Sequence, residues 1–264
     1  MKICLSTTIS RLMIKSLAPV NVIDNHAIQV PEDLVRIYKN FESRSVTIVK
    51  SLVSPGDVFV DVGANFGFYS VLASVLVGAS GRVHAIEPSP QTFELLVANT
   101  KDYANVKVHP VAVGNSDSKA SFFHSADYVN SGFAPDPFKD PLTLEQIEVR
   151  VQRLDSLLAT DTGSPSVDFL KVDVQGDDVD VLMGAKKIIE RNQTIKVLVE
   201  WAPAWMHNSG FDYLDLPNTL IDLGLKNIVA IDDWTNSTMT VSEFEAEIRS
   251  DNTGKRFCNL LAQK

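Results

Sequence analysis

The chain has 264 residues, a formal net charge of -9 and a sequence pI near 5.0. An acidic balance without a cluster of Lys and Arg disfavours a nucleic-acid partner and electrostatic docking to an anionic membrane. With 45% hydrophobic and 22% charged residues, the chain can bury a sizeable core, and a disordered chain is disfavoured.

The two ends of the chain carry few signals of targeting or of redox chemistry. Polar and charged residues interrupt the N-terminal apolar stretch, and no apolar run approaches the ~18 residues that span a bilayer. Cys4 and Cys258 have no metal-binding spacing, so we expect buried, reduced thiols. From these features we expect a cytoplasmic protein without membrane insertion, and the oligomeric state leaves no readable signal.

Residues 1–54 are predicted to form an N-terminal extension of short strands and a helix packed on the core. The pattern favours a short helix near Ser10–Leu17 and a strand pair between Val20 and Val30. Apolar residues at helical spacing then predict a helix over 31–53, which Pro55 and Gly56 end. We expect the remainder, residues 55–264, to be one ligand-binding domain.

From residue 58 onward, predicted strands and helices alternate. The strands are expected at Val58–Val62, Val83–Ile86, Val106–His109, Ser121–His124, Phe169–Val174, Ile195–Glu200, Asn227–Ile231 and Phe257–Ala262. The helices are expected at Phe68–Val77, Gln91–Tyr103, Val179–Ile189 and Leu214–Leu223. Apolar strands separated by helices predict an α/β fold with a mostly parallel, doubly wound sheet. The proline-rich residues 125–147 interrupt this rhythm and are predicted as a long loop, either a binding loop or a plain connection.

The first motif, VFVDVGANFGFYS, follows the pattern of a ligand-binding strand, turn and helix. Asp61 and Gly63 end the first core strand, and Gly67 opens the next helix. In open α/β sheets, ligands bind at this carboxyl edge. Glu87 ends the second strand, where an acidic side chain can accept hydrogen bonds from both ribose hydroxyls. This combination predicts a nucleoside site.

Spacing within the same motif distinguishes between nucleoside ligands. A dinucleotide needs closely spaced glycines that admit a pyrophosphate, whereas bulky Asn65 and Phe66 stand there in this chain. S-adenosylmethionine has no phosphate, and its amino group and sulfonium favour nearby carboxylates such as Asp61. The methyl donor therefore fits better, and an NAD-dependent oxidoreductase is the alternative because it shares the ribose-binding acid.

The second motif, LKVDVQG, brings charged groups to the same edge of the sheet. Alternation along a strand puts Lys171, Asp173 and Gln175 on one side. Asp173 is the first candidate for a general base that takes the proton of an acceptor hydroxyl; a cofactor contact or a helix cap is the alternative. Lys171 could orient Asp173 or an acceptor oxygen, or could form a structural ion pair.

Glu200 ends the following predicted strand and faces the same edge. It is a candidate for binding the acceptor or for helping to hold a cation. A divalent metal is conceivable, because Asp173, Asp177, Asp178 and Glu200 are hard oxygen ligands. No metal-specific spacing is present, so we assign no metal ligand.

Taken together, several segments resemble the FkbM family of S-adenosylmethionine-dependent methyltransferases. The matching segments are DVGANFG, AIEPSP, VHPVAVGN, LDSLL, LKVDVQGDDVDVLMGA and VLVEW, roughly over residues 55–200, and FCNLLA resembles the family's closing strand. The resemblance implies a class I methyltransferase (Rossmann-like) fold with a seven-stranded sheet, S-adenosylmethionine as cofactor and S-adenosylhomocysteine as product. It also implies O-methylation of a hydroxyl on a small molecule such as a sugar or natural product. N-methylation and a catalytically impaired cofactor-binding protein are the alternatives.

The positions at the strand ends and the resemblance together assign site residues. The catalytic residues would be Asp173, Lys171 and Glu200. The cofactor-binding residues would be Asp61, Gly63, Ala64, Asn65, Phe66, Gly67, Ser70, Glu87, Pro88, Ser89, Ala112, Val113 and Asp173, with Val113 against the adenine. The family has Glu where this chain has Gln175 and again where it has Asp178. Gln forms hydrogen bonds but cannot act as a base, so any proton removal that the family's Glu performs would shift to another group here.

Overall fold

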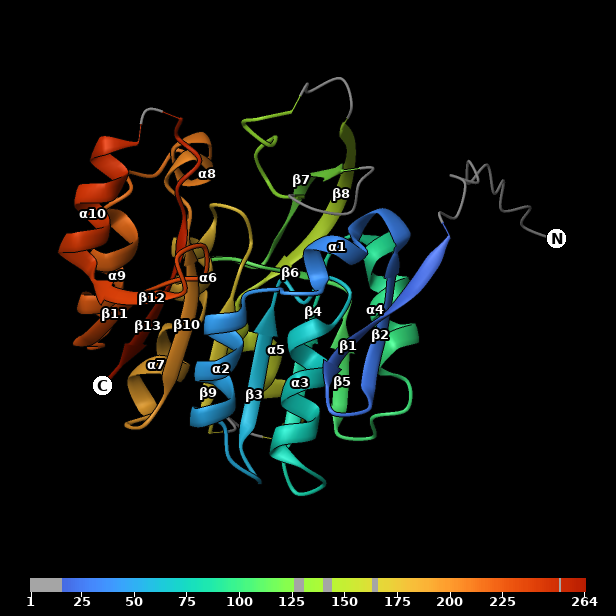
Figure 1. Ribbon diagram of the computed structural model, residues 1–264. Helices are drawn as coiled ribbons and strands as arrows, with labels where there is room; N and C mark the ends of the chain where they lie inside the picture. Colours follow the sequence, from blue (N-terminus) through green and yellow to red (C-terminus); the bar gives the residue numbers. More distant parts are fainter. Residues whose placement is uncertain (1–15, 126–130, 140–143, 163–165, 252) are drawn as a thin grey trace, which may run out of the picture.

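The computed structural model describes residues 16–125, 131–139, 144–162, 166–251 and 253–264. Within these residues the main sheet has eight strands in the order β12-β11-β13-β10-β9-β3-β4-β5 (Figure 1). The strands are β3 (Val58–Val62), β4 (Arg82–Ile86), β5 (Val106–His109), β9 (Phe169–Val172), β10 (Lys196–Trp201), β11 (Asn227–Asp232), β12 (Ser237–Thr240) and β13 (Cys258–Gln263). Strands β10, β9, β3, β4 and β5 run parallel, and β13 is antiparallel to both of its neighbours.

The sheet is doubly wound and mostly parallel, as predicted, but it has eight strands instead of seven. The additional strand is β12, which pairs antiparallel with β11 at the edge of the sheet. Its burial alternates between half-buried and exposed along Ser237–Thr240, and it contains one apolar residue, Met239. A strand of this composition leaves too weak a pattern to be recognised in the sequence.

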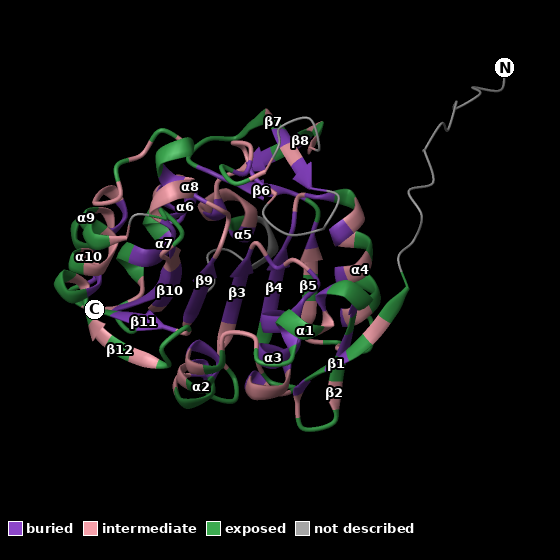
Figure 2. Cartoon of the chain, turned by 45° about the horizontal axis from the view of Figure 1, so that its top comes forward, coloured by how far each residue is buried: buried purple, intermediate pink, exposed green. Residues whose placement is uncertain are grey.

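Two hydrophobic layers cover the two faces of the sheet, whose central strands are buried (Figure 2). Phe59 and Phe169 stack on each other at 4.9 Å between ring centroids and pack on one face. Val60 and Leu170, one position further along the same strands, pack on the other face. This alternation explains why the strands read as uninterrupted apolar runs, since each face needs its own layer.

Helices form those layers on both faces. The first face is covered by α2 (Ser43–Leu52) and α3 (Phe68–Val77), and the other by α5 (Leu154–Thr162), α6 (Asp178–Gly184), α7 (Lys186–Arg191), α9 (Asp215–Asp222) and α10 (Val241–Ser250). Two further helices, α4 (Pro90–Thr100) and α8 (Pro203–Asn208), follow β4 and β10. Within the described residues, none of the helices is both long enough and apolar enough to cross a bilayer.

The predicted strand pair near the N-terminus is confirmed as an antiparallel hairpin. Strands β1 (Leu17–Ile23) and β2 (His26–Pro31) pair with each other and contact α3 and share its core. The predicted helix over residues 31–53 is interrupted. It consists of a 3-10 turn at Glu32–Leu34, the short α1 (Val35–Tyr38) and then α2. The helix expected near Ser10–Leu17 falls largely outside the described residues, and Leu17 begins β1.

A small three-stranded sheet lies above the carboxyl edge of the main sheet (Figure 1). It contains β6 (Ala112–Val113), β7 (Ser118–Ser125) and β8 (Leu144–Gln152) in the order β6-β8-β7. Strand β8 begins inside residues 125–147, which were predicted as a loop, so that prediction is wrong from Leu144 onward. Only Val149 and Val151 of β8 are buried. Residues 147–152 nevertheless alternate between apolar and polar, a strand pattern that the loop prediction overlooked.

The single helix predicted over Val179–Ile189 is instead two helices, because the chain turns at Ala185 between α6 and α7. Helices α5, α8 and α10 were not predicted. Cys258 is a buried, free thiol, as expected, and Cys4 lies outside the described residues.

Candidate functional site

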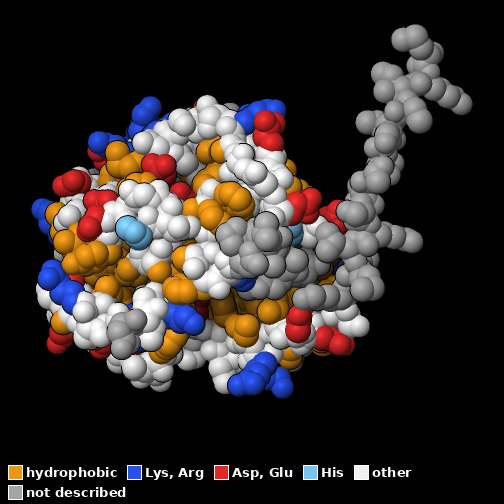
Figure 3. Space-filling view, turned by 90° about the horizontal axis from the view of Figure 1, so that it is seen from above, with side chains coloured by type: hydrophobic (Ala, Val, Ile, Leu, Met, Phe, Trp, Pro, Cys, Tyr) orange, Lys and Arg blue, Asp and Glu red, His pale blue; other side chains and the backbone are white. Residues whose placement is uncertain are grey.

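A cavity of about 510 Å³ opens at the carboxyl edge of the main sheet. Its walls come from the turn after β3, the ends of β4, β9 and β10, strand β6, the segment before α2, and two loops beside β11 and β13. Figure 3 looks down on this edge and shows hydrophobic side chains gathered around its centre. Segments from both ends of the chain therefore meet over the strand ends that carry the two motifs.

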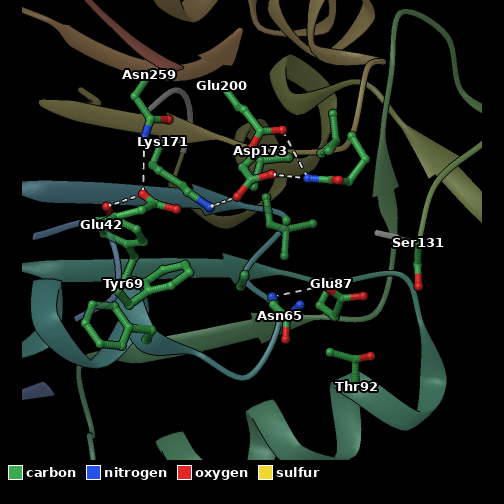
Figure 4. Close-up of a pocket in the computed structure, with 18 of the residues that line it drawn as sticks. Glu42, Asn65, Tyr69, Glu87, Thr92, Ser131, Lys171, Asp173, Glu200 and Asn259 are labelled. Atoms are coloured by element: carbon green, nitrogen blue, oxygen red, sulfur yellow. Dashed lines mark hydrogen bonds and ion pairs between the residues drawn. The ribbon is translucent and has the colours of Figure 1, made fainter. Parts of the chain in front are cut away.

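Glu87, directly after β4, is fixed in position by the backbone. Its Oε2 accepts a hydrogen bond from the N–H of Asn65 at 3.0 Å (Figure 4). Its Oε1 accepts one from the N–H of Ser89 at 2.9 Å. Burial raises the pKa of Glu87 to about 7, against the lowering effect of these two backbone donors. Each carboxylate oxygen retains a second lone pair, so Glu87 can accept two further hydrogen bonds from a ligand in the cavity.

The turn after β3 packs tightly against the end of β9. Gly63 has a φ of +78°, and a Cβ placed there would overlap the backbone carbonyl oxygen of Asp173. Only glycine allows this close approach, which draws the two motif segments together at the cavity floor. Asn65 also adopts a left-handed conformation, with a φ of 49°, and Asn tolerates this conformation better than most residues.

Lys171 lies buried among carboxylates. Its Nζ is 3.2 Å from Asp173 Oδ2 and 3.8 Å from Asp61 Oδ1, and it sits over the ring of Tyr69 at 5.2 Å from the centroid. These carboxylates keep the pKa of Lys171 above its usual value even though burial opposes the charge. The ammonium group is therefore charged and already compensated by its neighbours.

Asp61 lies behind the cavity wall and is completely buried. Its Oδ2 accepts a hydrogen bond from Ser70 Oγ at 2.6 Å, whereas its Oδ1 accepts no hydrogen bond within the described part of the chain. Burial raises its pKa, and Lys171 lowers it. Because this buried oxygen accepts no hydrogen bond, its negative charge is stabilised by the positive charge of Lys171.

Gln175 joins the ends of β9 and β10. Its Nε2 donates to Asp173 Oδ1 at 2.8 Å and to Glu200 Oε2 at 3.1 Å (Figure 4). Burial and the charge of Asp173 raise the pKa of Glu200 well above its usual value. A glutamate at position 175 would bring a third acid to this point, whereas the amide links two existing acids.

Replacing Gln175 by Glu should therefore destabilise the fold. While ionised, the new carboxylate has no proton to donate to Asp173 or Glu200, and we expect a loss of about 1–3 kcal/mol in the free energy of unfolding at pH 8. The loss should shrink as the pH is lowered, because a protonated Glu can donate again. Urea unfolding measures the loss in the free energy of unfolding. The control is Gln146→Glu on the exposed part of β8, which should change stability by less than about 0.5 kcal/mol. Equal effects of the two substitutions would contradict this role of Gln175.

Glu42, which the sequence analysis missed, forms the opposite wall. Its Oε2 accepts hydrogen bonds from Tyr69 Oη at 2.6 Å and from Asn259 Nδ2 at 3.2 Å (Figure 4). Burial raises its pKa to about 7. Its left-handed backbone, with a φ of 40°, interrupts the helix expected in this segment. A single charged residue in a predicted amphipathic helix gave no sign that it would reach a site built elsewhere.

The predicted site residues fall into two groups. Those that line the cavity are Gly63, Ala64, Asn65, Glu87, Pro88, Ala112, Val113, Lys171, Asp173 and Glu200. Those that lie outside its lining are Asp61, Phe66, Gly67, Ser70 and Ser89. The second group supports the first: the Ser89 N–H donates to Glu87, and Asp61, which accepts from Ser70, lies 3.8 Å from Lys171.

The acidic residues considered as metal ligands have other partners. Asp178 Oδ1 and Oδ2 accept from the N–H groups of Val174 and Gly176, which fixes the turn before α6. Asp177 accepts from Ser209 Oγ at 3.2 Å. Within the described ranges, no group of three or more His, Cys, Asp or Glu side chains is arranged to hold a metal ion.

The sheet, with its antiparallel β13 between β10 and β11 and its ligand-sized cavity at the carboxyl edge, has the Rossmann-like class I methyltransferase fold. The model of the methyltransferase FkbM domain matches residues 61–226. The chain therefore belongs to the FkbM methyltransferase domain family, as the motifs suggested.

Individual relatives match over a shorter stretch. The chain is 31% identical over 160 residues to the 31-O-demethyl-FK506 methyltransferase FkbM of Streptomyces tacrolimicus, covering 50% of this chain and 60% of that protein. It is 29% identical over 136 residues to the hexuronic acid methyltransferase AglP of Haloferax volcanii, covering 51% and 52%. The chain thus spans only about half to three fifths of these relatives.

Among solved structures, an FkbM methyltransferase from Methylobacillus flagellatus KT is similar to this chain. It has a TM-score of 0.48 and 16% sequence identity, and the match covers 88% of this chain and 60% of that one. Glu42, Asp233 and Asn259, which line the cavity, lie outside the residues that the family model matches.

Proposed function

We propose that the chain binds S-adenosylmethionine and transfers its methyl group to a hydroxyl of a small-molecule acceptor. The observation that carries this proposal is Glu87, held at the cavity wall by two backbone N–H groups with both oxygens able to accept further hydrogen bonds. Family membership and the relative named as an O-demethyl-FK506 methyltransferase support it. The net charge of -9 favours a small-molecule acceptor over a nucleic acid, and we propose a cytoplasmic location.

The residues of the donor half fit S-adenosylmethionine. Glu87 would accept hydrogen bonds from the ribose hydroxyls, and the apolar Ala112 and Val113 would contact the adenine. Gly63 and Ala64 would lie along the methionine portion, with no room made for a pyrophosphate. The carboxylate of Asp173 at the cavity floor would lie near the positive charge of the donor, for which it is a complementary partner.

When bound, S-adenosylmethionine would supply a methyl group on a sulfonium, which leaves as a neutral thioether. Asp173 would accept the acceptor's hydroxyl proton as the new carbon–oxygen bond forms. Lys171 would keep Asp173 oriented through the contact of 3.2 Å. Glu200, held through Gln175, would contact the acceptor from the end of β10.

Because Gln175 and Lys171 occupy Asp173 from two sides, a protein that binds the donor but transfers no methyl group is the second candidate. Calorimetric titration with S-adenosylhomocysteine tests binding, and formation of that product from S-adenosylmethionine with hydroxylated acceptors tests transfer. Loss of product formation in an Asp173→Ala protein that still binds S-adenosylhomocysteine, which lacks the sulfonium charge, would support the first candidate. If neither S-adenosylmethionine nor S-adenosylhomocysteine binds, the proposed function is refuted. If NAD alone raises the melting temperature of the protein, an oxidoreductase replaces the proposed methyltransferase.

The affinity for S-adenosylhomocysteine should depend on pH through Glu87. The ribose hydroxyls donate to the ionised carboxylate, and its pKa is about 7, so the affinity rises as the pH increases from 6 to 8. With that pKa, the ionised fraction changes about tenfold over this range, and the dissociation constant should fall by about tenfold. Calorimetry at pH 6, 7 and 8 measures the change.

Glu87→Gln provides the control for this pH dependence. The amide keeps the shape of the side chain but has no carboxyl proton to lose. We therefore expect weaker binding whose dependence on pH between 6 and 8 is nearly flat. A variant with the same slope as the unmodified protein would assign the titration to another group.

A further inference from the structure

The walls of the cavity have an uneven balance of charge. Within the described residues, Lys171 is the only basic residue that lines it. The acids that line it are Glu42, Glu87, Asp173, Glu200 and Asp233. Burial raises the pKa of Glu200 well above its usual value, whereas Glu42 and Glu87, with pKa values of about 7, are mostly ionised at pH 7.5. Lys171 is already paired with Asp61 and Asp173 at 3.8 and 3.2 Å. The lining therefore offers no uncompensated positive charge to a ligand.

Two of these acids, Glu42 and Asp233, lie away from the donor half. Glu42 reaches the cavity from the segment before α2, and Tyr69 and Asn259 fix one of its oxygens (Figure 4). Asp233 lies in the loop after β11, where it accepts hydrogen bonds from the N–H of Arg44 at 2.7 Å and from Ser45 Oγ at 2.5 Å. Glu42, Asp233 and Asn259 lie outside the region that the family model matches, so family membership alone does not predict this wall.

The mouth of the same wall is apolar. Trp234 is 61% exposed and Ile37 is 54% exposed, although both line the cavity. The Trp234 ring packs edge-on against Phe257 at 5.5 Å between centroids, and Phe257 also lines the cavity. Exposed large apolar groups that adjoin a pocket mark a surface that binds an apolar part of a ligand.

An anionic acceptor would meet an unfavourable field at this site. Its carboxylate or phosphate would approach the Glu42 and Asp173 carboxylates without a free cation to pair with, and like charges repel strongly in a partly buried cavity. An uncharged hydroxylated molecule avoids this repulsion and can donate hydrogen bonds to the same carboxylates. Its apolar body can lie on Trp234 and Phe257.

From this arrangement we infer that the acceptor is an uncharged, hydroxylated molecule with an apolar body, and that the cavity rejects acceptors carrying a carboxylate or phosphate. The inference rests on the proposed function and names its acceptor class. It separates this chain from the relative named as a hexuronic acid methyltransferase, because a hexuronate carries a carboxylate.

Two probes that differ only at C6 of the sugar, with a hydroxymethyl group in one and a carboxylate in the other, test the inference. The probes are 4-nitrophenyl β-glucopyranoside and 4-nitrophenyl β-glucuronide, which share the sugar ring and the aromatic group. Ligand-observed NMR titration against the protein saturated with S-adenosylhomocysteine at pH 7.5 gives both dissociation constants. We expect the glucuronide to bind at least about tenfold more weakly than the glucoside.

A pair of variants assigns the selectivity to the wall. Glu42→Gln retains an oxygen that can accept from Tyr69 and Asn259, so it should fold normally while removing one negative charge. We expect it to reduce the preference for the glucoside by at least about threefold. The control is Glu32→Gln, an exposed residue of the same segment, which should leave the preference unchanged.

The outcomes separate this inference from the proposed function. If S-adenosylhomocysteine does not bind, the proposed function fails. If it binds, equal or tighter binding of the glucuronide overturns the inference alone, and so does the absence of binding by either sugar. An unchanged preference in Glu42→Gln would also overturn it, since the wall would not be the source of the selectivity.

Discussion

Replacing Gly63 by alanine should lower the free energy of unfolding by about 3–5 kcal/mol, which would reduce the melting temperature by roughly 10 °C. Two costs combine. Alanine at a φ of +78° is strained, and its Cβ would overlap the backbone carbonyl oxygen of Asp173 and lie 2.9 Å from the carbonyl carbon. Both neighbours are backbone atoms of a buried strand end, so they cannot move aside as a flexible side chain could.

Gly224→Ala separates the two costs. Gly224 has a closely similar φ of +84°, but a Cβ there would have no atom within 4 Å. This control should lose only about 1–2 kcal/mol, the cost of the left-handed backbone. Urea unfolding of both variants gives the difference, which measures the close approach of the two motif segments. Equal losses would show that the segments can move apart without penalty.

The close contact between Gly63 and the backbone of Asp173 should also affect binding. Displacing the carbonyl of Asp173 would also shift its carboxylate relative to Lys171, which lies 3.2 Å away. A Gly63→Ala protein that still folds should therefore bind S-adenosylhomocysteine more weakly than the Gly224→Ala control. The close packing of β3 against β9 thus connects the stability of the fold to the geometry of the candidate site.

The strands that build the site could be predicted from the sequence because each is a short apolar run with a clear end. Strand β3 was predicted with the bounds that the structure shows, Val58–Val62, and α3 likewise with Phe68–Val77. In a parallel sheet, such runs must bury both faces, and the polar residues that follow them meet at one edge. For this reason Glu87, Asp173 and Glu200 could be expected near one another.

The opposite wall could not be predicted in this way. Glu42, Asp233 and Asn259 come from segments far apart in the sequence. Asp233 and Asn259 face the cavity because β13 pairs with β10 and carries β11 on its other side, and Glu42 reaches it from the segment before α2. A left-handed residue at Glu42 also breaks the helical pattern that predicted one continuous helix. Tertiary packing decides such positions, and local periodicity carries no record of it.

The predicted cofactor residues that lie outside the cavity lining illustrate a second limit. Phe66 and Ser70 belong to the same motif as Gly63 and Asn65, yet both are completely buried and lie outside the lining. Neighbouring side chains point in different directions, because successive residues of a strand alternate between its two faces and successive residues of a helix are spread around its axis. A motif in the sequence therefore marks both the residues that line the site and those that support them.

Replacing Lys171 by methionine should lower the free energy of unfolding by about 3–5 kcal/mol at pH 8. Lys171 is 4% exposed and Asp61 is fully buried, so the substitution leaves a buried carboxylate without its compensating charge, which is costlier than losing an exposed pair. The matched control is Lys119→Met on the surface. Lys119 pairs with Glu148 at 2.6 Å, but both side chains are about two-thirds exposed, and the loss there should stay below about 1 kcal/mol.

The pH dependence of the Lys171→Met variant identifies the cause. Lys171 lowers the pKa of Asp61 while burial raises it, so the variant should raise that pKa further. A carboxyl group whose pKa is raised in the folded state destabilises the fold wherever the unfolded group ionises. The penalty is therefore absent below about the unfolded pKa of 3.8, grows as the pH rises from there toward the folded pKa, and reaches its full size above the folded pKa. Urea unfolding at pH 8 and pH 5 should show the loss shrinking at the lower pH.

A second substitution should restore part of the stability. Asp61→Asn, introduced into Lys171→Met, removes the uncompensated charge but keeps an oxygen that can accept from Ser70 Oγ, which lies 2.6 Å from Asp61. We expect the double variant to recover at least about 2 kcal/mol at pH 8 and to lose most of the pH dependence. If Asn at position 61 instead adds to the loss, then the packing of the Lys171 side chain, and not its charge, stabilises the end of β9. In that case Lys171 could no longer be treated as neutralised by the neighbouring carboxylates. The inferred rejection of anionic acceptors, which relies on this neutralisation, would lose its support.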